Sequence, residues 1–262
     1  MSRIEKVFTK PGHTALIAYI TTGYPSIDAT LKAVPALAKS GCDIIELGIP
    51  FSDPLADGVT IQNASYDALQ NGITPDICLE LAGELRKKVD TPLVFMSYYN
   101  PIYHYGIERF CKACSASGID GLIIPDLPPE EGDEIEQSTL NHGIDLIYLL
   151  APTSNDERIR LGAEHSRGFI YMVSVTGVTG ARSFLPSDLK DFITSVREVT
   201  DKPLCVGFGI STPEQAEQVG NLADGVIVGS RIVQLLESDD SISRIDVFIS
   251  ELRQALDSTN QA

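Results

Sequence analysis

Short apolar runs alternate with amphipathic segments along the whole chain, and this alternation limits the possible folds more than any other feature of the sequence. The runs are rich in Ile, Leu and Val and fall at residues 16–22, 43–49, 92–98, 121–126, 145–151, 169–174, 203–208 and 225–229. Their length and composition are typical of strands that are buried on both faces. Segments between them, such as 27–40 and 187–199, carry apolar residues at helical spacing. The pattern predicts a series of βα units.

The number of units favours a closed barrel. Eight strands are predicted, with starts that run from residue 16 to residue 225, so each unit takes about 30 residues, the size of a βαβ element. No Gly-, Ser- or Pro-rich linker divides the chain, and we therefore expect a single (β/α)8 TIM barrel domain over residues 1–262. An open doubly wound sheet is the competing architecture, but the first βα turn, Thr22-Gly23-Tyr24-Pro25, lacks the GxGxxG fingerprint. Additional helical segments are predicted at 2–10, where a helix could cover the barrel floor, at 60–70 and 75–88 after the second strand, and at 241–257 near the C-terminus.

Composition argues against several classes of function. The chain has 20 Lys and Arg against 36 Asp and Glu, a formal net charge of −16, whereas nucleic acids select basic surfaces. No apolar run reaches the roughly 18 residues of a membrane span, and the N-terminal segment has no apolar signal core. The cysteines and histidines are scattered without metal-ligand spacing, so we expect free thiols, no metal site and a cytoplasmic location.

Glu46 is the first candidate catalytic residue. Alternate side chains of a strand share a face, so Ile45 and Leu47 would pack on the helices while Glu46 and Gly48 point into the barrel. A carboxyl group inside the barrel loses hydration, which raises its pKa toward the range that is useful for acid–base catalysis. The alternative is a structural ion pair or an exposed carboxylate at the strand end.

Two further carboxylates lie in the loop that follows this strand. Residues 50–58 read PFSDPLADG, which places Asp53 and Asp57 above the strand that carries Glu46. Carboxyl groups in different environments can divide the roles of proton donor and charge stabiliser. Both could instead be turn or N-cap residues ahead of the helix predicted at 60–70.

Two Gly-rich strand ends predict a phosphate site. The seventh strand ends in Gly207-Phe208-Gly209-Ile210-Ser211 and the eighth in Val228-Gly229-Ser230, and both lead into helices. In phosphate-binding barrels the loops after strands 7 and 8 hold the phosphate with backbone N–H groups. The small, Gly-rich segment after the sixth strand, 175–186, is predicted to be a lid. The alternatives are tight helix-entry turns and a surface loop without a role.

A longer pattern resembles a known family. Residues 45–58, IELGIPFSDPLADG, are similar to the signature of the tryptophan synthase alpha subunit. Further matching segments follow in the family's order: Thr21-x-Gly23-Tyr24-Pro25, Tyr98-x-Asn100-Pro101, Pro125-Asp126-Leu127-Pro128, Gly177-Val178-Thr179-Gly180, Gly207-Phe208-Gly209-Ile210 and Gly229-Ser230. The resemblance covers nearly the whole chain. It implies a lyase that splits indole-3-glycerol phosphate into indole and glyceraldehyde 3-phosphate.

The resemblance also implies roles for individual residues. Glu46 would protonate indole C3 and then remove the proton of the adjacent glycerol hydroxyl, while Asp57 would accept a hydrogen bond from the indole N–H. The other implied site residues are Tyr171, Phe208, Ile61, Tyr19 and Met96 around the substrate, Gly180, Gly209, Gly229 and Ser230 at the phosphate, and Thr179 and Arg182 in the lid.

The family further implies a protein partner. In an α2β2 complex the beta subunit, a pyridoxal-phosphate enzyme, would use the indole, so no cofactor is expected in this chain. The interface would include Pro50, Asp53 and Asn100, in the loops after the second and third strands. Three other functions stay open: a free-standing indole-3-glycerol phosphate lyase, another phosphate-sugar barrel enzyme such as an isomerase, and a non-catalytic regulator of a beta-type partner.

Overall fold

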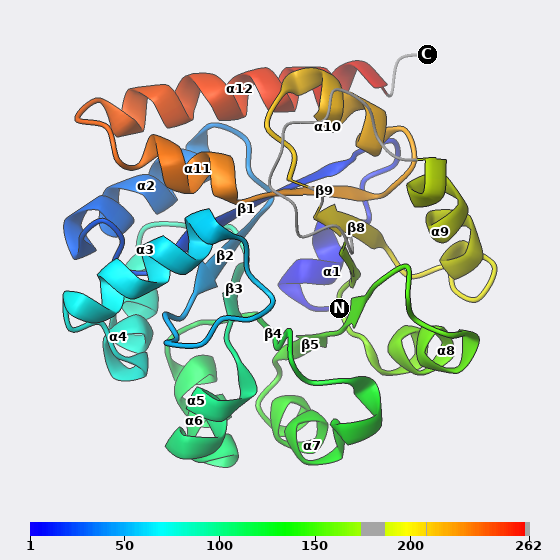
Figure 1. Cartoon of the computed structure of the whole chain (residues 1–262), viewed down its shortest axis with the longest axis horizontal. Coiled ribbons are helices and arrows are strands. Elements are labelled where there is room, and N and C mark those ends of the chain that lie inside the picture. The colour runs from blue at the N-terminus through cyan, green and yellow to red at the C-terminus, as the bar shows by residue number, and fades with distance from the viewer. Residues whose placement is uncertain (174–186, 208, 260–262) are drawn as a thin grey trace.

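A parallel sheet curled into a barrel forms the centre of the molecule (Figure 1). The computed structural model describes residues 1–173, 187–207 and 209–259. Within these ranges the strands are β1 (Ala15–Thr21), β2 (Ile44–Gly48), β3 (Leu93–Met96), β4 (Gly121–Ile123), β5 (Asp145–Ile147), β6 (Leu149–Leu150), β7 (Ile170–Val173), β8 (Leu204–Gly207) and β9 (Gly225–Val228). All eight predicted strands are confirmed, and the run at 145–151 is divided into β5 and β6.

This divided run closes the barrel. The strand order is β5-β4-β3-β2-β1-β9-β8-β7-β6, with parallel pairing throughout. Its two ends, β5 and β6, are separated along the chain only by Tyr148. The Tyr148 carbonyl accepts a hydrogen bond from the Tyr171 N–H of β7 at 3.0 Å. One run of chain therefore pairs with β4 on one side and β7 on the other, and the (β/α)8 barrel is confirmed.

Helices surround the barrel as the alternating pattern predicted (Figure 1). Those in the described ranges are α1 (Arg3–Val7), α2 (Ile27–Lys39), α3 (Val59–Gln70), α4 (Pro75–Arg86), α5 (Tyr99–Tyr105), α6 (Ile107–Ala116), the 3-10 turn η1 (Pro129–Glu131), α7 (Asp133–Asn141), α8 (Asp156–His165), α9 (Ser187–Arg197), α10 (Pro213–Gly220), α11 (Ser230–Leu235) and α12 (Ser241–Thr259). The extra helices at the N-terminus, after β2 and near the C-terminus are confirmed. None of the described helices is long and apolar enough to cross a membrane.

Side chains of β2 point alternately to the outer and the inner face of the sheet, as their pattern predicted. Ile45 and Leu47 belong to the large apolar cluster between the sheet and the helices. Ile44 belongs to a second cluster inside the barrel, together with Ile17 of β1. Ile4 of α1 is completely buried in this inner cluster. The predicted N-terminal helix therefore closes the barrel floor, and the functional site is left to the opposite, C-terminal ends of the strands.

Aspartates at the floor repeat one arrangement around the barrel. Asp120, just before β4, accepts a hydrogen bond from the Leu93 N–H of β3 at 3.0 Å and pairs with Arg86 of α4 at 2.9 Å. The same contacts with a backbone N–H and with an arginine recur at Asp43 (Leu16 and Arg253) and at Asp224 (Leu204 and Arg197). Each aspartate ties two adjacent strands to an outer helix, so the floor serves stability rather than chemistry.

Candidate active site

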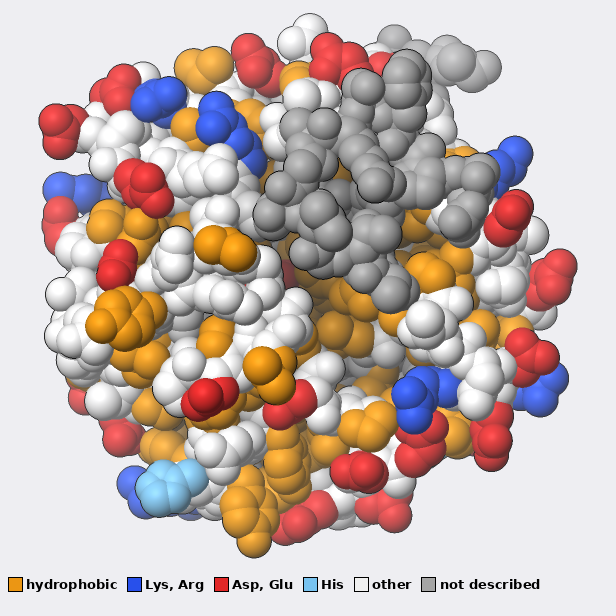
Figure 2. Space-filling model, in the orientation of Figure 1, with side chains coloured by type: hydrophobic (Ala, Val, Ile, Leu, Met, Phe, Trp, Pro, Cys, Tyr) orange, Lys and Arg blue, Asp and Glu red, His pale blue; other side chains and the backbone are white. Residues whose placement is uncertain are grey.

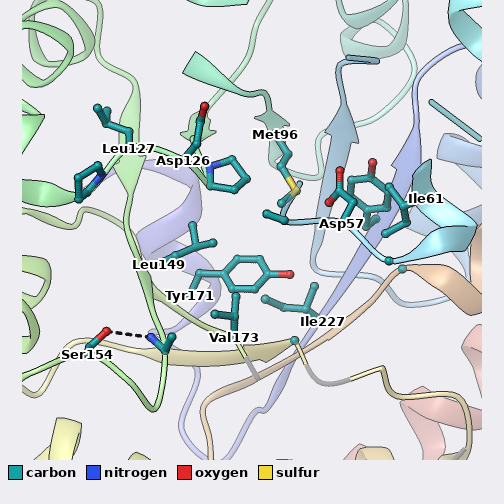
Figure 3. A pocket seen from close by; sticks show the side chains of 18 of the residues that line it. Asp57, Ile61, Met96, Asp126, Leu127, Leu149, Ser154, Tyr171, Val173 and Ile227 are labelled. Carbon is teal, nitrogen blue, oxygen red and sulfur yellow. Dashed lines mark hydrogen bonds between the residues drawn. The ribbon is translucent and has the colours of Figure 1, made fainter. Parts of the chain in front are cut away.

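A cavity of about 610 Å³ opens at the C-terminal ends of the strands. Eight residues predicted from the sequence share its wall: Tyr19, Asp57, Ile61, Met96, Tyr171, Gly209, Gly229 and Ser230. Figure 3 shows the side chains of Tyr171, Ile227 and Met96 converging on this space, with Asp57 approaching from the loop after β2. Strands far apart in the sequence therefore build one site, as expected for a barrel of this type.

Glu46 lies on the inner face of β2 and is not itself among the described residues that line the cavity. Its register neighbours are Tyr19 of β1 and Val94 of β3, and its side chain has no solvent exposure. Neither carboxyl oxygen has a hydrogen-bond partner within the described part of the chain. Burial raises the pKa of Glu46 from 4.5 to about 8 because the ionised form loses hydration without compensation. At neutral pH the Glu46 carboxyl is therefore mostly protonated and can act as an acid.

Asp57 occupies a different environment at the end of the loop after β2. It is half-buried, and burial raises its pKa to about 6, against the lowering effect of a hydrogen bond donated by the Tyr98 hydroxyl. The same hydroxyl accepts a hydrogen bond from the Ala56 N–H at 2.9 Å. The N-cap of α3 is Gly58, without a side-chain capping bond, so Asp57 is not the N-cap; its N–H closes a turn by donating to the Pro54 carbonyl at 3.0 Å.

Two tyrosines inside the barrel pack closely against glycines of the neighbouring strand. A methyl group on Gly48 of β2 would overlap with the Tyr19 hydroxyl, and one on Gly207 of β8 would lie 2.6 Å from the Tyr171 hydroxyl oxygen. Only glycine permits these close approaches. The two glycines therefore fix where the Tyr19 and Tyr171 hydroxyl groups reach the cavity.

The predicted phosphate residues are brought together in part. Gly209 follows β8 with a φ of 66°, and Gly229 and Ser230 lead from β9 into α11. β8 and β9 are paired neighbours, so backbone N–H groups from both can face one part of the cavity. The other predictions for the phosphate, the lid and the indole wall, namely Gly180, Thr179, Arg182 and Phe208, lie outside the described residues.

Comparison with known proteins identifies the family. Residues 6–259 match the family described as Tryptophan synthase alpha chain. The chain belongs to this family. It is 59% identical over 257 residues to the tryptophan synthase alpha chain of Dehalococcoides mccartyi, covering 98% of this chain and 100% of that one. It is 48% identical over 262 residues to the alpha chain of Geobacter sulfurreducens, covering 98% and 99%.

Solved structures agree with this assignment. The alpha chain from Legionella pneumophila superimposes with a TM-score of 0.90 at 37% identity, over 98% of both chains. A structure of Mycobacterium tuberculosis tryptophan synthase gives 0.91 at 39%, over 97% of this chain and 98% of the other. As a member of this family, the protein cleaves indole-3-glycerol phosphate to indole and glyceraldehyde 3-phosphate in tryptophan biosynthesis. The family's alpha chain needs no cofactor of its own for this carbon–carbon lyase reaction.

The three residues predicted for a partner interface have different exposures. Asp53 and Asn100 are exposed on the loop after β2 and on α5, whereas Pro50 is buried. Pro50 can therefore shape the loop but offers little surface to a partner.

Several residues of the site have no role that the sequence predicted. Tyr98, which supports the Asp57 loop by accepting a hydrogen bond from the Ala56 N–H, belongs to the Tyr98-x-Asn100-Pro101 motif. That motif was the sequence signal that could have pointed to this residue. Asp126, in the Pro125-Asp126-Leu127-Pro128 segment, lines the cavity and accepts a hydrogen bond from the Tyr99 N–H at 2.8 Å. Arg158 of α8 also lines the cavity and pairs with Glu130 of η1 at 2.9 Å. No sequence signal separated Arg158 from an ordinary solvated residue on a helix.

The described part of the chain has no candidate metal site. No group of three or more His, Cys, Asp or Glu side chains there is arranged to hold an ion. Cys111 and Cys114 are buried free thiols on α6, as expected for residues on the inner face of a helix.

Proposed function

We propose that Glu46 and Asp57 carry the chemistry of indole-3-glycerol phosphate cleavage in this chain. The observation that supports this assignment is the completely buried Glu46 carboxyl, whose oxygens lack partners in the described structure and whose pKa is raised to about 8. Such a group is protonated at neutral pH and can donate its proton. Asp57, with a pKa of about 6, is ionised at the same pH and can stabilise positive charge.

The proposed steps follow from the needs of the reaction. Indole C3 has to be protonated before the ring can accept the electrons of the breaking carbon–carbon bond, and Glu46 would turn toward the cavity to supply this proton. The positive charge then resides on the indole nitrogen, whose N–H would donate a hydrogen bond to the Asp57 carboxylate. The ionised Glu46 would next remove the proton of the adjacent glycerol hydroxyl, and bond cleavage would release indole and the aldehyde.

The remaining predicted residues would bind the substrate. Tyr171 would orient the glycerol hydroxyls, while Ile61, Met96 and Phe208 would contact the indole ring. The phosphate would be held by backbone N–H groups at Gly180, Gly209, Gly229 and Ser230, which suits a chain with a net charge of −16 because neutral N–H donors can replace a basic cluster. Thr179 and Arg182 would belong to a lid that excludes water.

Indole release from indole-3-glycerol phosphate tests the catalytic assignment. Glu46→Gln and Asp57→Asn should each lower kcat by at least about 100-fold, in line with the loss of one acid–base or charge-stabilising group. Asp67→Asn, at an exposed position on α3, is the matched control and should keep wild-type turnover. Normal turnover in either active-site variant would remove that residue from the mechanism.

We further propose that this chain binds a tryptophan synthase beta chain, which would hold the pyridoxal phosphate, to form an α2β2 complex. The support is a set of exposed apolar side chains on the segments that follow β2 and β3: Leu55 in the loop after β2, Val59 and Tyr66 on α3, and Tyr103 on α5. Figure 2 shows hydrophobic side chains gathered over the region of α3 and α5. Exposed apolar clusters of this kind are typical of protein interfaces, and Asp53 and Asn100 lie on the same elements. The buried free cysteines would suit a reducing compartment such as the cytoplasm.

Gel filtration and activity with the cognate beta chain test this partnership. We expect a stable complex and faster indole production than by the alpha chain alone. Fast turnover by the isolated chain without complex formation would favour a free-standing lyase. Activation of the beta chain by a wild-type alpha chain that releases no indole would favour a regulator.

A further inference from the structure

The Tyr19 hydroxyl lies near polar groups at the C-terminal ends of β1 and β2: Thr21 is its hydrogen-bond partner, and Asp57 and Glu46 interact with it electrostatically. Tyr19 is the register neighbour of Glu46 across the β1–β2 pair, and its ring leans along β2 so that the hydroxyl lies over Gly48. Gly48 follows Glu46 by two residues on the same inner face. The side chain is 6% exposed and lines the cavity. The recorded hydrogen-bond partner of this hydroxyl is Thr21 Oγ1 at 3.4 Å, which is long for an O–H···O bond.

Glu46 needs a hydrogen-bond donor once it has given up its proton. In its resting position the carboxyl is completely buried and its oxygens are without partners among the described residues. A carboxylate there is strongly disfavoured, and it also needs a donor after the side chain has turned toward the cavity to reach indole C3. An acid that must ionise in the middle of each turnover would therefore work slowly without one.

Three titratable side chains on other strands interact electrostatically with Glu46: Tyr19 of β1, Tyr171 of β7 and Cys205 of β8. The Tyr171 hydroxyl lies against Gly207, and the Cys205 thiol lies against Gly225. A thiol is in addition a weak donor. The charge of Asp57 raises the pKa of both tyrosines. Its own carboxylate can only accept a hydrogen bond, so Asp57 cannot be the donor to Glu46. Both tyrosine hydroxyls lie against glycines, so the difference is in the strands: β1 pairs with β2 in register at Glu46, whereas in the described sheet β7 and β8 do not pair with β2. Tyr19 is therefore the donor on the strand next to Glu46.

We propose that the Tyr19 hydroxyl is a positioning residue that donates a hydrogen bond to the Glu46 carboxylate while that carboxylate exists during turnover. When Glu46 passes its proton to indole C3, the Glu46 O–H bond breaks and the C3–H bond forms. The resulting carboxylate accepts the Tyr19 O–H hydrogen bond, without transfer of the Tyr19 proton. The carboxylate then takes the proton of the glycerol hydroxyl, and the hydrogen bond is released. This inference rests on the proposed role of Glu46 as the acid.

Tyr19→Phe tests the inference, because it removes the hydroxyl and keeps the ring. Loss of a hydrogen bond to a charged group should lower kcat by about tenfold or more, with little change in KM. The basic limb of the kcat–pH profile should also move to higher pH, because a carboxylate that has lost a donor holds its proton more tightly. Thr21→Val is the matched control. It removes the recorded partner of Tyr19 but leaves the hydroxyl, so it should keep the wild-type kcat and pH profile.

Three outcomes would overturn the inference. One is wild-type kcat and pH profile in Tyr19→Phe. Another is a change in KM alone, which would make Tyr19 only a wall of the indole pocket. The third is the same loss in Thr21→Val, which would mean that the hydroxyl merely anchors the ring. Failure of the Glu46 assignment is recognised separately, because Glu46→Gln would then retain turnover.

Discussion

Replacing Glu46 by Gln should stabilise the folded protein, and the gain should increase with pH. Glu46 is completely buried, and burial raises its pKa from 4.5 to about 8. The folded state therefore binds the proton more tightly than the unfolded state. Between these two pH values the unfolded state carries fewer protons, so the free energy of unfolding falls as the pH rises. Gln does not titrate, so the free energy of unfolding of the variant does not fall in this way as the pH rises.

The size of the effect follows from the two pKa values. Relative to the pH-independent Gln side chain, the ionisable carboxyl costs the fold about 1 kcal/mol at pH 5, about 3 kcal/mol at pH 7 and about 5 kcal/mol at pH 9. The packing of the amide adds a constant offset. The increase of about 4 kcal/mol between pH 5 and pH 9 is therefore the quantity that tests the reasoning.

Urea unfolding followed by circular dichroism at pH 5, 7 and 9 measures this difference. Tyrosine fluorescence gives a second probe, since the chain has no Trp. Glu84→Gln, at an exposed position on α4, is the control and should show the same pH dependence as the wild type. A difference between Glu46→Gln and wild type that stays constant with pH would refute the claim that burial without partners sets the protonation state of Glu46. The stabilised variant should be inactive, because its amide cannot donate and recover the proton.

Three further predictions concern the site and the barrel floor. The kcat/KM of the wild type should rise with pH as Asp57 ionises near pH 6 and fall as Glu46 loses its proton near pH 8; initial rates from pH 5 to 10 that keep rising through pH 8 would contradict it. Gly48→Ala places a methyl group against the Tyr19 hydroxyl and should cost about 1–3 kcal/mol in urea unfolding, together with activity; unchanged stability would show that the ring can move freely. Asp120→Asn removes the carboxylate that pairs with both Arg86 and Arg3 and should cost about 3 kcal/mol of unfolding free energy. Its kcat should be normal where the protein is folded, because the floor is remote from the cavity.

Features that repeat a short-range pattern along the chain are the ones that the sequence predicted best. Alternation in 43–49 assigned Ile45 and Leu47 to the outer face and Glu46 to the inner face, and both assignments are confirmed. The reason is that the side-chain direction of a strand is fixed by the backbone alone. The signature at 45–58 identified the family because it fixes many residue types in sequence.

Contacts between segments that are far apart in the chain could not be predicted from the sequence. The role of Tyr98 in holding the Asp57 loop joins residues about 40 positions apart, and nothing in the local pattern of either segment indicates the other. The helix α5 was not predicted either, because its sequence, YNPIYHY, has little helical preference; Pro101 is tolerated there since it lies in the first turn.

The sequence by itself determined the order of strands and helices, the inward direction of Glu46 and the family to which the chain belongs, because these depend on local periodicity and on residue identity. Only the tertiary structure decided that the run at 145–151 closes the barrel at Tyr148, that the Glu46 carboxyl has no partner among the described residues, and that Tyr19 lies over Gly48 beside it. These features arise where separate strands meet, and the distance between their side chains is set by the curvature and register of the closed sheet.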